Sequence, residues 1–129
     1  MKRNTVQRQI TLKAVQKLNT HPTVDEVYSE VIKDHPAISK VTVYRNLRQL
    51  GGSCEIRQVI LPGEQERYDK RTDQHYHLKC KNCGILFDID IEYRSDMDEA
   101  VRLKYDLQID EHETIFSGVC SKCKDDVTE

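Results

Sequence analysis

Four of the five cysteines form two Cys-x-x-Cys pairs, which is a spacing that can bind a metal ion. Cys80 and Cys83 make the first pair, and Cys120 and Cys123 make the second pair after 36 intervening residues. Four thiolates supplied as two pairs are typical of a closed tetrahedral zinc site that stabilises a fold. A thiol–disulfide switch on the same residues is the alternative, since structural zinc can be lost on oxidation. The spacing therefore predicts structural Zn²⁺.

Two histidines lie directly before the first cysteine pair. His75 and His77 are two residues apart, so on a strand both side chains point to the same face. A four-cysteine site has no vacancy for them, which indicates a second metal. Asp88 follows in the alternating segment 85–91, and Asp69 lies between the two halves of the chain. Imidazoles with carboxylates suit Fe(II), Mn(II) or Zn(II), although a surface strand can also carry two histidines without function.

Composition and charge limit the fold and its partners. With 129 residues, 37% of them hydrophobic and no Trp, the chain can form one domain or two small ones without a large core. Small domains of this kind often depend on a metal or a partner subunit. Residues 1–67 carry 11 Lys/Arg against 7 Asp/Glu, whereas residues 68–129 carry 9 against 15. The basic first half favours a polyanion such as nucleic acid, although solvated surfaces show similar imbalances.

No segment is apolar over the length of a membrane span, and the first residues do not lead into a secretory signal. We therefore expect a cytoplasmic protein with no membrane partner. Reducing conditions in that compartment favour metal binding over disulfides for paired cysteines.

The elements that must position these residues begin with two helices. Apolar residues recur at helical spacing in residues 7–19, which predicts a first helix. Thr23 and Glu26 have the form of a capping box at the start of a second helix, which we expect to end near His35-Pro36.

A third helix is predicted over residues 40–50, with Ser39 as its N-cap. One face of it is apolar, and the other is basic and aromatic, as suits a DNA major groove or, alternatively, a solvated surface. Residues 55–61 and 66–69 are β-prone and flank Pro62-Gly63, which predicts a two-stranded wing. Residues 1–69 then form a winged helix-turn-helix domain, with a hinge at about 68–74. The candidate DNA-binding residues are Lys40, Thr42, Tyr44, Arg45 and Arg48.

The remaining segment, 75–129, reads as a small α/β domain. After the strand at 85–91 we expect a helix over 92–105 and a strand over 107–119. Such a unit is a plausible dimerisation element. The predicted fold class is α+β.

Together these residues resemble the ferric uptake regulator family of bacterial metal-dependent repressors over nearly the whole chain. The resemblance rests on Thr5-x-Gln7-Arg8, His21-Pro22-Thr23-x-Asp25-x-x-Tyr28, Ser39-x-x-Thr42-Val43-Tyr44-Arg45-Asn46-Leu47, Arg67-Tyr68-Asp69, His75-x-His77-x-x-Cys80-x-x-Cys83-Gly84 and Cys120-x-x-Cys123. It implies a homodimer that binds AT-rich inverted-repeat operators in double-stranded DNA. It also implies structural zinc on the four paired cysteines.

The resemblance further implies a regulatory Fe²⁺ or Mn²⁺ site made of His21, Asp69, His75, His77 and Asp88. A metal that joins both halves would set the spacing of the two reading heads in the dimer and favour the DNA-binding shape. Within the family, an aspartate at position 88 resembles the peroxide-stress branch, in which iron-dependent oxidation of a ligand histidine releases the DNA. His21 and His75 are then the oxidation candidates. The alternative is a repressor that responds to iron, manganese or zinc availability.

Some positions depart from the family pattern. Gln74 and Tyr76 replace two members of a further histidine-rich metal site, so we assign no metal to His112. Cys54 stands where relatives carry glycine, and we expect a strained positive-φ backbone there that the preceding Gly51-Gly52 partly relieves. Outside the family, a zinc hydrolase or deaminase would need a general-base motif that is missing, and a zinc-ribbon module that binds protein would not use the basic helix.

Overall fold

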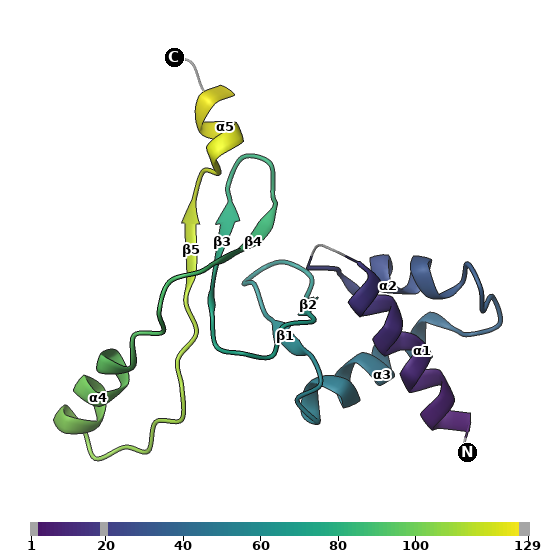
Figure 1. The fold of residues 1–129 in the computed structure, drawn as a ribbon, viewed down its shortest axis with the longest axis horizontal. Coiled ribbons are helices and arrows are strands. Elements are labelled where there is room, and N and C mark those ends of the chain that lie inside the picture. The colour runs from purple at the N-terminus through teal and green to yellow at the C-terminus, as the bar shows by residue number, and fades with distance from the viewer. Residues whose placement is uncertain (1–2, 19–20, 127–129) are drawn as a thin grey trace. The chain divides into compact units, whose positions relative to one another are not determined.

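The computed structural model describes residues 3–18 and 21–126, and the chain forms two compact units, Met1–Thr72 and Asp73–Glu129 (Figure 1). We call them unit 1 and unit 2. Within the described ranges, no helix is long and apolar enough to cross a membrane. The predicted α+β fold class is confirmed.

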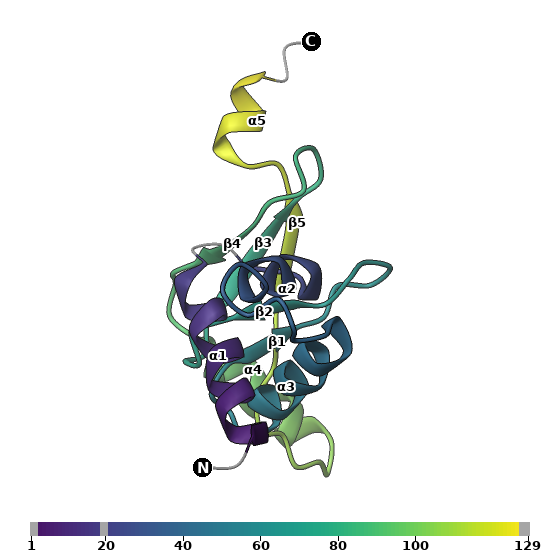
Figure 2. The ribbon, with the colours of Figure 1, turned by 90° about the vertical axis from the view of Figure 1, so that its right-hand side faces the viewer.

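Unit 1 contains three helices, α1 (Arg3–Lys17), α2 (Val24–Val31) and α3 (Lys40–Gly52) (Figure 2). They pack around one apolar core. The prediction of three helices is confirmed, but some of their bounds differ, and α3 continues two residues beyond its predicted end at Leu50. Helix α1 begins four residues earlier than predicted, and the predicted end at Asn19 lies outside the described residues. Helix α2 ends before His35-Pro36, because the chain leaves the helix in a turn that His35 N–H closes onto the Val31 carbonyl at 3.0 Å.

Local hydrogen bonds start α2 and α3 where the sequence predicts. The Thr23 hydroxyl accepts from Glu26 N–H at 3.3 Å, and the Glu26 carboxylate accepts from Thr23 N–H at 2.9 Å, which completes the capping box. The Ser39 hydroxyl accepts from Thr42 N–H at 3.1 Å at the start of α3. Both caps use residues three apart, so they can be recognised without tertiary information.

The end of α3 confirms the predicted positive φ at Cys54 but not the predicted role of Gly51-Gly52. Gly51 and Gly52 belong to the helix and have no positive φ, so they do not relieve the strain at Cys54, whose φ is +64°. The N–H of Cys54 donates to the Gly51 carbonyl at 3.2 Å, and the N–H of Glu55 donates to the Leu50 carbonyl at 3.0 Å. This pair of bonds is a Schellman motif, whose left-handed position is occupied by glycine in most proteins.

Replacing Cys54 with glycine is therefore expected to stabilise unit 1 by about 1 kcal/mol, because glycine adopts the left-handed conformation without a Cβ clash. Thermal melting of the zinc-loaded protein measures the gain. Cys54→Ala removes the thiol but keeps the Cβ, and should give none. Equal melting temperatures for the alanine and glycine variants would show that the backbone at this position is not strained.

The wing follows α3. Strands β1 (Arg57–Val59) and β2 (Arg67–Asp69) pair antiparallel, with Gln58 opposite Tyr68. The predicted turn lies between them: Gly63 has a φ of +75°, and Glu64 N–H donates to the Leu61 carbonyl at 3.1 Å. Both strands are shorter than predicted, since only three residues of each keep the ladder. Three helices and this ribbon make the winged helix-turn-helix.

Unit 2 is built on a three-stranded sheet. Strand β3 (Tyr76–Cys80) lies between β4 (Leu86–Ile89), which is antiparallel to it, and β5 (Ile115–Gly118), which is parallel. The helices α4 (Ser95–Lys104) and α5 (Ser121–Asp126) lie beyond opposite ends of the sheet (Figures 1 and 2).

Three elements of unit 2 differ in length from the prediction. The helix predicted over 92–105 and the strand predicted over 85–91 are both shorter, and the strand predicted over 107–119 is reduced to β5. A parallel neighbour must return along β3 after a crossover, so most of residues 107–114 are used as connection and not as strand. The sequence did not indicate α5.

Candidate metal centres and nucleic-acid interface

The four paired cysteines converge in unit 2. Cys80 ends β3, and Cys83 follows in a tight turn closed by Gly84, whose φ is +81°. Cys120 precedes α5 and Cys123 lies in it, so the otherwise unexpected helix presents the second pair. All four sulfur atoms lie within 4.8 Å of one another.

The spacing of the sulfur atoms fits zinc and not a disulfide. Cys83 Sγ and Cys120 Sγ are 3.8 Å apart. Tetrahedral Zn–S bonds of about 2.3 Å separate neighbouring sulfur atoms by about 3.8 Å, whereas a disulfide needs about 2.05 Å. All five cysteines are free thiols. The donor set therefore suits structural zinc, as predicted.

Hydrogen bonds and burial shift the pKa values of two cysteine thiols in opposite directions. The N–H groups of Cys83 and Cys120 donate to Cys80 Sγ, each at 3.4 Å, and lower the pKa of Cys80 to about 5. For Cys123, a hydrogen bond from Asn82 lowers the pKa, but burial and the neighbouring thiols outweigh it and raise the value to about 12. Four thiolates this close repel one another, so a divalent cation is needed to hold all of them deprotonated.

A second donor group in unit 2 contains His75, His77 and Asp88. Asp88 Oδ1 lies 3.1 Å from His75 Nε2 and 3.5 Å from His77 Nε2. His77 and Asp88 are cross-strand partners, and both imidazoles are buried. His75 Nδ1 donates to the Asp73 carbonyl at 2.7 Å, which leaves the lone pair of Nε2 facing Asp88. The role of Asp73 as hydrogen-bond acceptor for His75 could not be predicted from the sequence, because every residue type has a backbone carbonyl.

Unit 1 holds a smaller donor pair. His21 Nε2 lies 3.2 Å from Asp69 Oδ2, and both side chains are buried. Asp69 ends β2, where its Oδ1 accepts from Arg71 N–H at 2.9 Å. The Arg67 guanidinium donates to the His21 carbonyl at 3.0 Å and so fixes the loop before α2 against the wing. Arg67 is a positioning residue that spacing alone does not reveal.

Nitrogen and carboxylate donors of these two groups suit Fe²⁺ or Mn²⁺. Carboxylate oxygens are hard ligands, and imidazole accommodates most first-row metals. Neither group offers a thiolate, so the His/Asp set differs in chemistry from the cysteine cluster.

The outward face of α3 carries four exposed residues that the sequence analysis singled out, and Thr42 is half-buried. Arg48 donates to the Tyr44 hydroxyl at 2.9 Å, and its guanidinium lies 5.7 Å from the centre of the Tyr44 ring. Lys40 forms an ion pair with Asp25 of α2. Arg45 is exposed. This outward face consists of Lys40, Thr42, Tyr44, Arg45 and Arg48.

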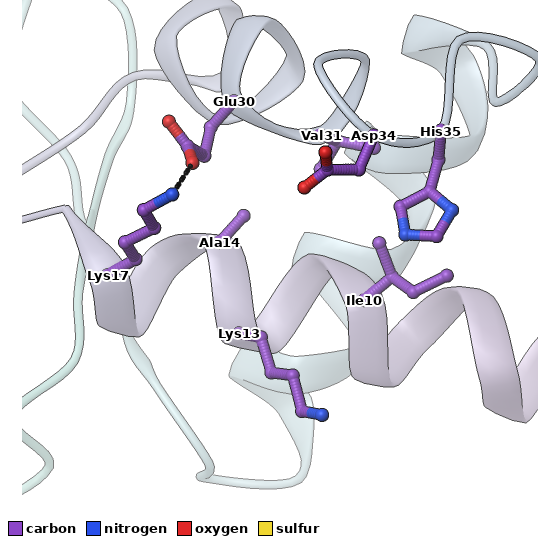
Figure 3. A pocket seen from close by; sticks show the side chains of 8 residues that line it. All are labelled: Ile10, Lys13, Ala14, Lys17, Glu30, Val31, Asp34 and His35. Atoms are coloured by element: carbon purple, nitrogen blue, oxygen red, sulfur yellow. Dashed lines mark ion pairs between the residues drawn. The ribbon is translucent and has the colours of Figure 1, made fainter.

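A surface pocket between α1 and α2 contains none of the metal-donor groups described above (Figure 3). Lys17 reaches across it to Glu30 at 2.8 Å, and Lys33 contacts the same carboxylate at 3.1 Å. Only the Lys17–Glu30 pair connects α1 to α2, because Lys33 and Glu30 are three residues apart in the chain. Such ion pairs near the surface contribute little stability individually.

The chain matches a known protein family. The model of the ferric uptake regulator family matches residues 2–117. The chain belongs to the ferric uptake regulator family. The resemblance seen in the sequence is thereby confirmed.

Two of the similar proteins are named for a response to peroxide. The peroxide-responsive repressor PerR of Staphylococcus aureus is 32% identical over 123 residues, which cover 95% of this chain and 83% of PerR. The Campylobacter jejuni peroxide stress regulator is 28% identical with a TM-score of 0.77, over 93% of this chain and 90% of that one. The Helicobacter pylori ferric uptake regulator Fur is 21% identical with a TM-score of 0.76, over 92% and 80%. The last shows the shared fold alone.

Family membership establishes a metal-responsive repressor and not an enzyme. It rejects the hydrolase or deaminase alternative directly. Membership of this family of DNA-binding regulators also rejects a zinc-ribbon module that binds protein instead of DNA.

Proposed function

We propose that this chain is a peroxide-sensing repressor that binds AT-rich inverted-repeat operators as a homodimer. The observation that carries the proposal is the pair of short carboxylates, Asp69 and Asp88, each within 3.2 Å of a buried imidazole. Similarity to two proteins named for peroxide response supports it. The aspartate side chain of Asp88 is long enough to approach both histidine rings, at 3.1 Å and 3.5 Å.

The regulatory metal, Fe²⁺ or Mn²⁺, is proposed to bind both donor groups, namely His21, Asp69, His75, His77 and Asp88. The support comes from the sequence, in which five residues, 70–74, separate Asp69 from His75. A metal held by ligands on both sides of these residues would restrict the orientation of the winged-helix domains. It would thereby shift the conformational population toward the form that binds DNA.

DNA binding is assigned to the outward face of α3, whose Arg45 and Arg48 can pair with guanine edges or phosphates. The homodimer is assigned to unit 2, which exposes a group of large apolar side chains that water would otherwise contact. These are Ile85, Ile91, Met97, Val101, Leu103, Tyr105, Leu107, Phe116 and Val119.

Peroxide sensing is assigned to the same ligands. Bound Fe²⁺ supplies a reaction with hydrogen peroxide that Mn²⁺ does not. His21 and His75 are the candidates to gain one oxygen, and each then loses its place as a neutral imidazole donor. Without those donors the DNA-binding shape is no longer favoured, and the operator is released.

An anaerobic DNA-binding titration tests the proposal. Protein loaded with Fe²⁺ or Mn²⁺ is titrated onto an operator before and after a small dose of peroxide, and its peptides are then mass-mapped. We expect only the Fe²⁺ form to release DNA, with one oxygen added to the His21 or His75 peptide. Arg45→Ala serves as the control for DNA contact, since it should keep both metals but bind about 10–100-fold more weakly.

If both metal forms keep their DNA and neither histidine is modified, the protein responds to metal availability instead. Loss of DNA binding from both forms, without histidine modification, would point to the cysteine cluster as the peroxide target and would also contradict the proposal.

A further inference from the structure

A closed hydrogen-bond network lies in unit 2, outside both groups of metal donors. It joins Tyr76 of β3 to Tyr93 and Asp98, at the start of α4, and to His112 of the segment before β5. All residues of α4 that have side chains described are at least partly exposed except Asp98, which is 4% exposed. A carboxylate is costly to bury unless it is hydrogen-bonded, so the partners of Asp98 are significant.

The bonds of the network form a ring. Tyr93 O–H donates to Asp98 Oδ2, and His112 Nδ1 lies 2.7 Å from Asp98 Oδ1. His112 Nε2 lies 2.8 Å from the Tyr76 hydroxyl. Two backbone groups complete it: Arg94 N–H donates to the Tyr76 oxygen at 2.9 Å, and His112 N–H donates to the Tyr93 oxygen at 2.9 Å. The rings of Tyr93 and His112 stack with centroids 4.6 Å apart.

The positions of the protons follow from these partners. The hydrogen bond from Tyr93, and then that from His112, hold the pKa of Asp98 below its usual range, so Asp98 is a carboxylate that can only accept. His112 Nδ1 therefore carries a proton and donates to Asp98, while Nε2 is hydrogen-bonded to the Tyr76 hydroxyl. Both ring nitrogens of His112 are used by the protein, which leaves neither as a metal donor.

Tyr76 connects this network to the regulatory ligands. It lies between His75 and His77 in the chain, and successive side chains of an extended segment point to opposite faces. The network therefore holds one face of β3 while the two imidazoles are presented on the other. Tyr76 is 3% exposed, and its hydroxyl is tied to the backbone at Arg94, so a twist of β3 at this residue would move both imidazoles.

We propose that the network of Tyr76, His112 and Asp98 is a metal-independent positioning device that keeps His75 and His77 directed at Asp88. The inference rests on the proposed function of those three residues as ligands of the regulatory metal. Tyr76 and His112 are positioning residues, because they act on the metal only through β3. The network thus fixes the orientation of the ligand side chains on β3 in the metal-free protein.

Tyr76→Phe tests the inference, since it removes one hydroxyl and leaves the ring in place. Changes in groups that orient metal ligands lower metal affinity by about 10–100-fold, and we expect a loss of that size for Mn²⁺ in the zinc-loaded dimer. Zinc content should not change. The measurement is an equilibrium titration with Mn²⁺, followed by its electron paramagnetic resonance signal.

Thr11→Val is the matched control in unit 1. Thr11 is fully buried, and its hydroxyl donates to the Gln7 carbonyl at 2.9 Å and accepts from the Asn46 amide at 3.2 Å. Loss of the Thr11 hydroxyl should lower the melting temperature, as loss of the Tyr76 hydroxyl should. It should leave the affinity for Mn²⁺ unchanged. Equal Mn²⁺ affinities for the wild type and Tyr76→Phe would overturn the inference, as would an equal loss of affinity in Thr11→Val.

Two further variants complete the test. Asp98→Asn keeps the side-chain volume and one acceptor, so a smaller loss of Mn²⁺ affinity is expected even if Tyr76→Phe does not fold. The number of metal ions bound per chain is compared between the wild type and His112→Gln. The two counts should be equal, and one ion fewer in His112→Gln would show that the network is itself a metal site. Failure of the proposed function is separate: it would appear as normal Mn²⁺ binding by His77→Ala, with or without an effect of Tyr76→Phe.

Discussion

Replacing Cys80 with serine is expected to remove the structural zinc and to unfold unit 2. Cys80 Sγ accepts two backbone N–H groups at 3.4 Å and has the lowered pKa of a ready zinc ligand. Structural zinc contributes an apparent free energy of about 10–16 kcal/mol in small zinc domains, which exceeds the total stability of most domains. Zinc analysis, circular dichroism and size-exclusion chromatography should show loss of metal, of unit 2 structure and of the dimer.

Cys54→Ser is the matched control for that substitution. Cys54 is an exposed free thiol in unit 1, so its serine variant should keep zinc and remain dimeric. A Cys80→Ser protein that contains no zinc yet melts normally as a dimer would contradict a structural role for the cluster.

Replacing His77 with alanine is expected to abolish metal-dependent DNA binding and leave the fold intact. Changes to residues that only orient a ligand already lower metal affinity by about 10–100-fold, so removal of the imidazole itself should exceed about 100-fold. The strand should persist, because the backbone N–H of His77 still donates to the Thr114 carbonyl, at 3.3 Å in the native protein. Operator binding as a function of Mn²⁺ concentration measures the effect.

His35→Ala provides the comparison, since His35 is exposed in unit 1 and belongs to neither donor group. It should bind Mn²⁺ and operator like the wild type. Retention of Mn²⁺-dependent DNA binding in His77→Ala, with zinc still present, would remove His77 from the regulatory site.

Features that depend on residues near one another in sequence could be predicted from the sequence alone. The capping box of Thr23 and Glu26, the cap at Ser39 and the turn at Pro62-Gly63 each involve residues within three positions. The two Cys-x-x-Cys pairs belong to the same class, because the ligand geometry of zinc restricts their spacing. The positive φ of Cys54 was expected from the family resemblance instead, because relatives carry glycine at this position.

Features that depend on distant partners were decided only by the tertiary structure. β5 is short because its pairing with β3 determines its length, and α5 forms where it carries Cys123 to the other thiols. The network through Tyr76, Asp98 and His112 joins residues up to 36 positions apart, with no period for a pattern to reveal. His112 could be excluded from metal binding by the residues missing around it. What it does instead follows from where the fold places Asp98 and Tyr76, because a hydrogen bond depends on distance in space and not on distance along the chain.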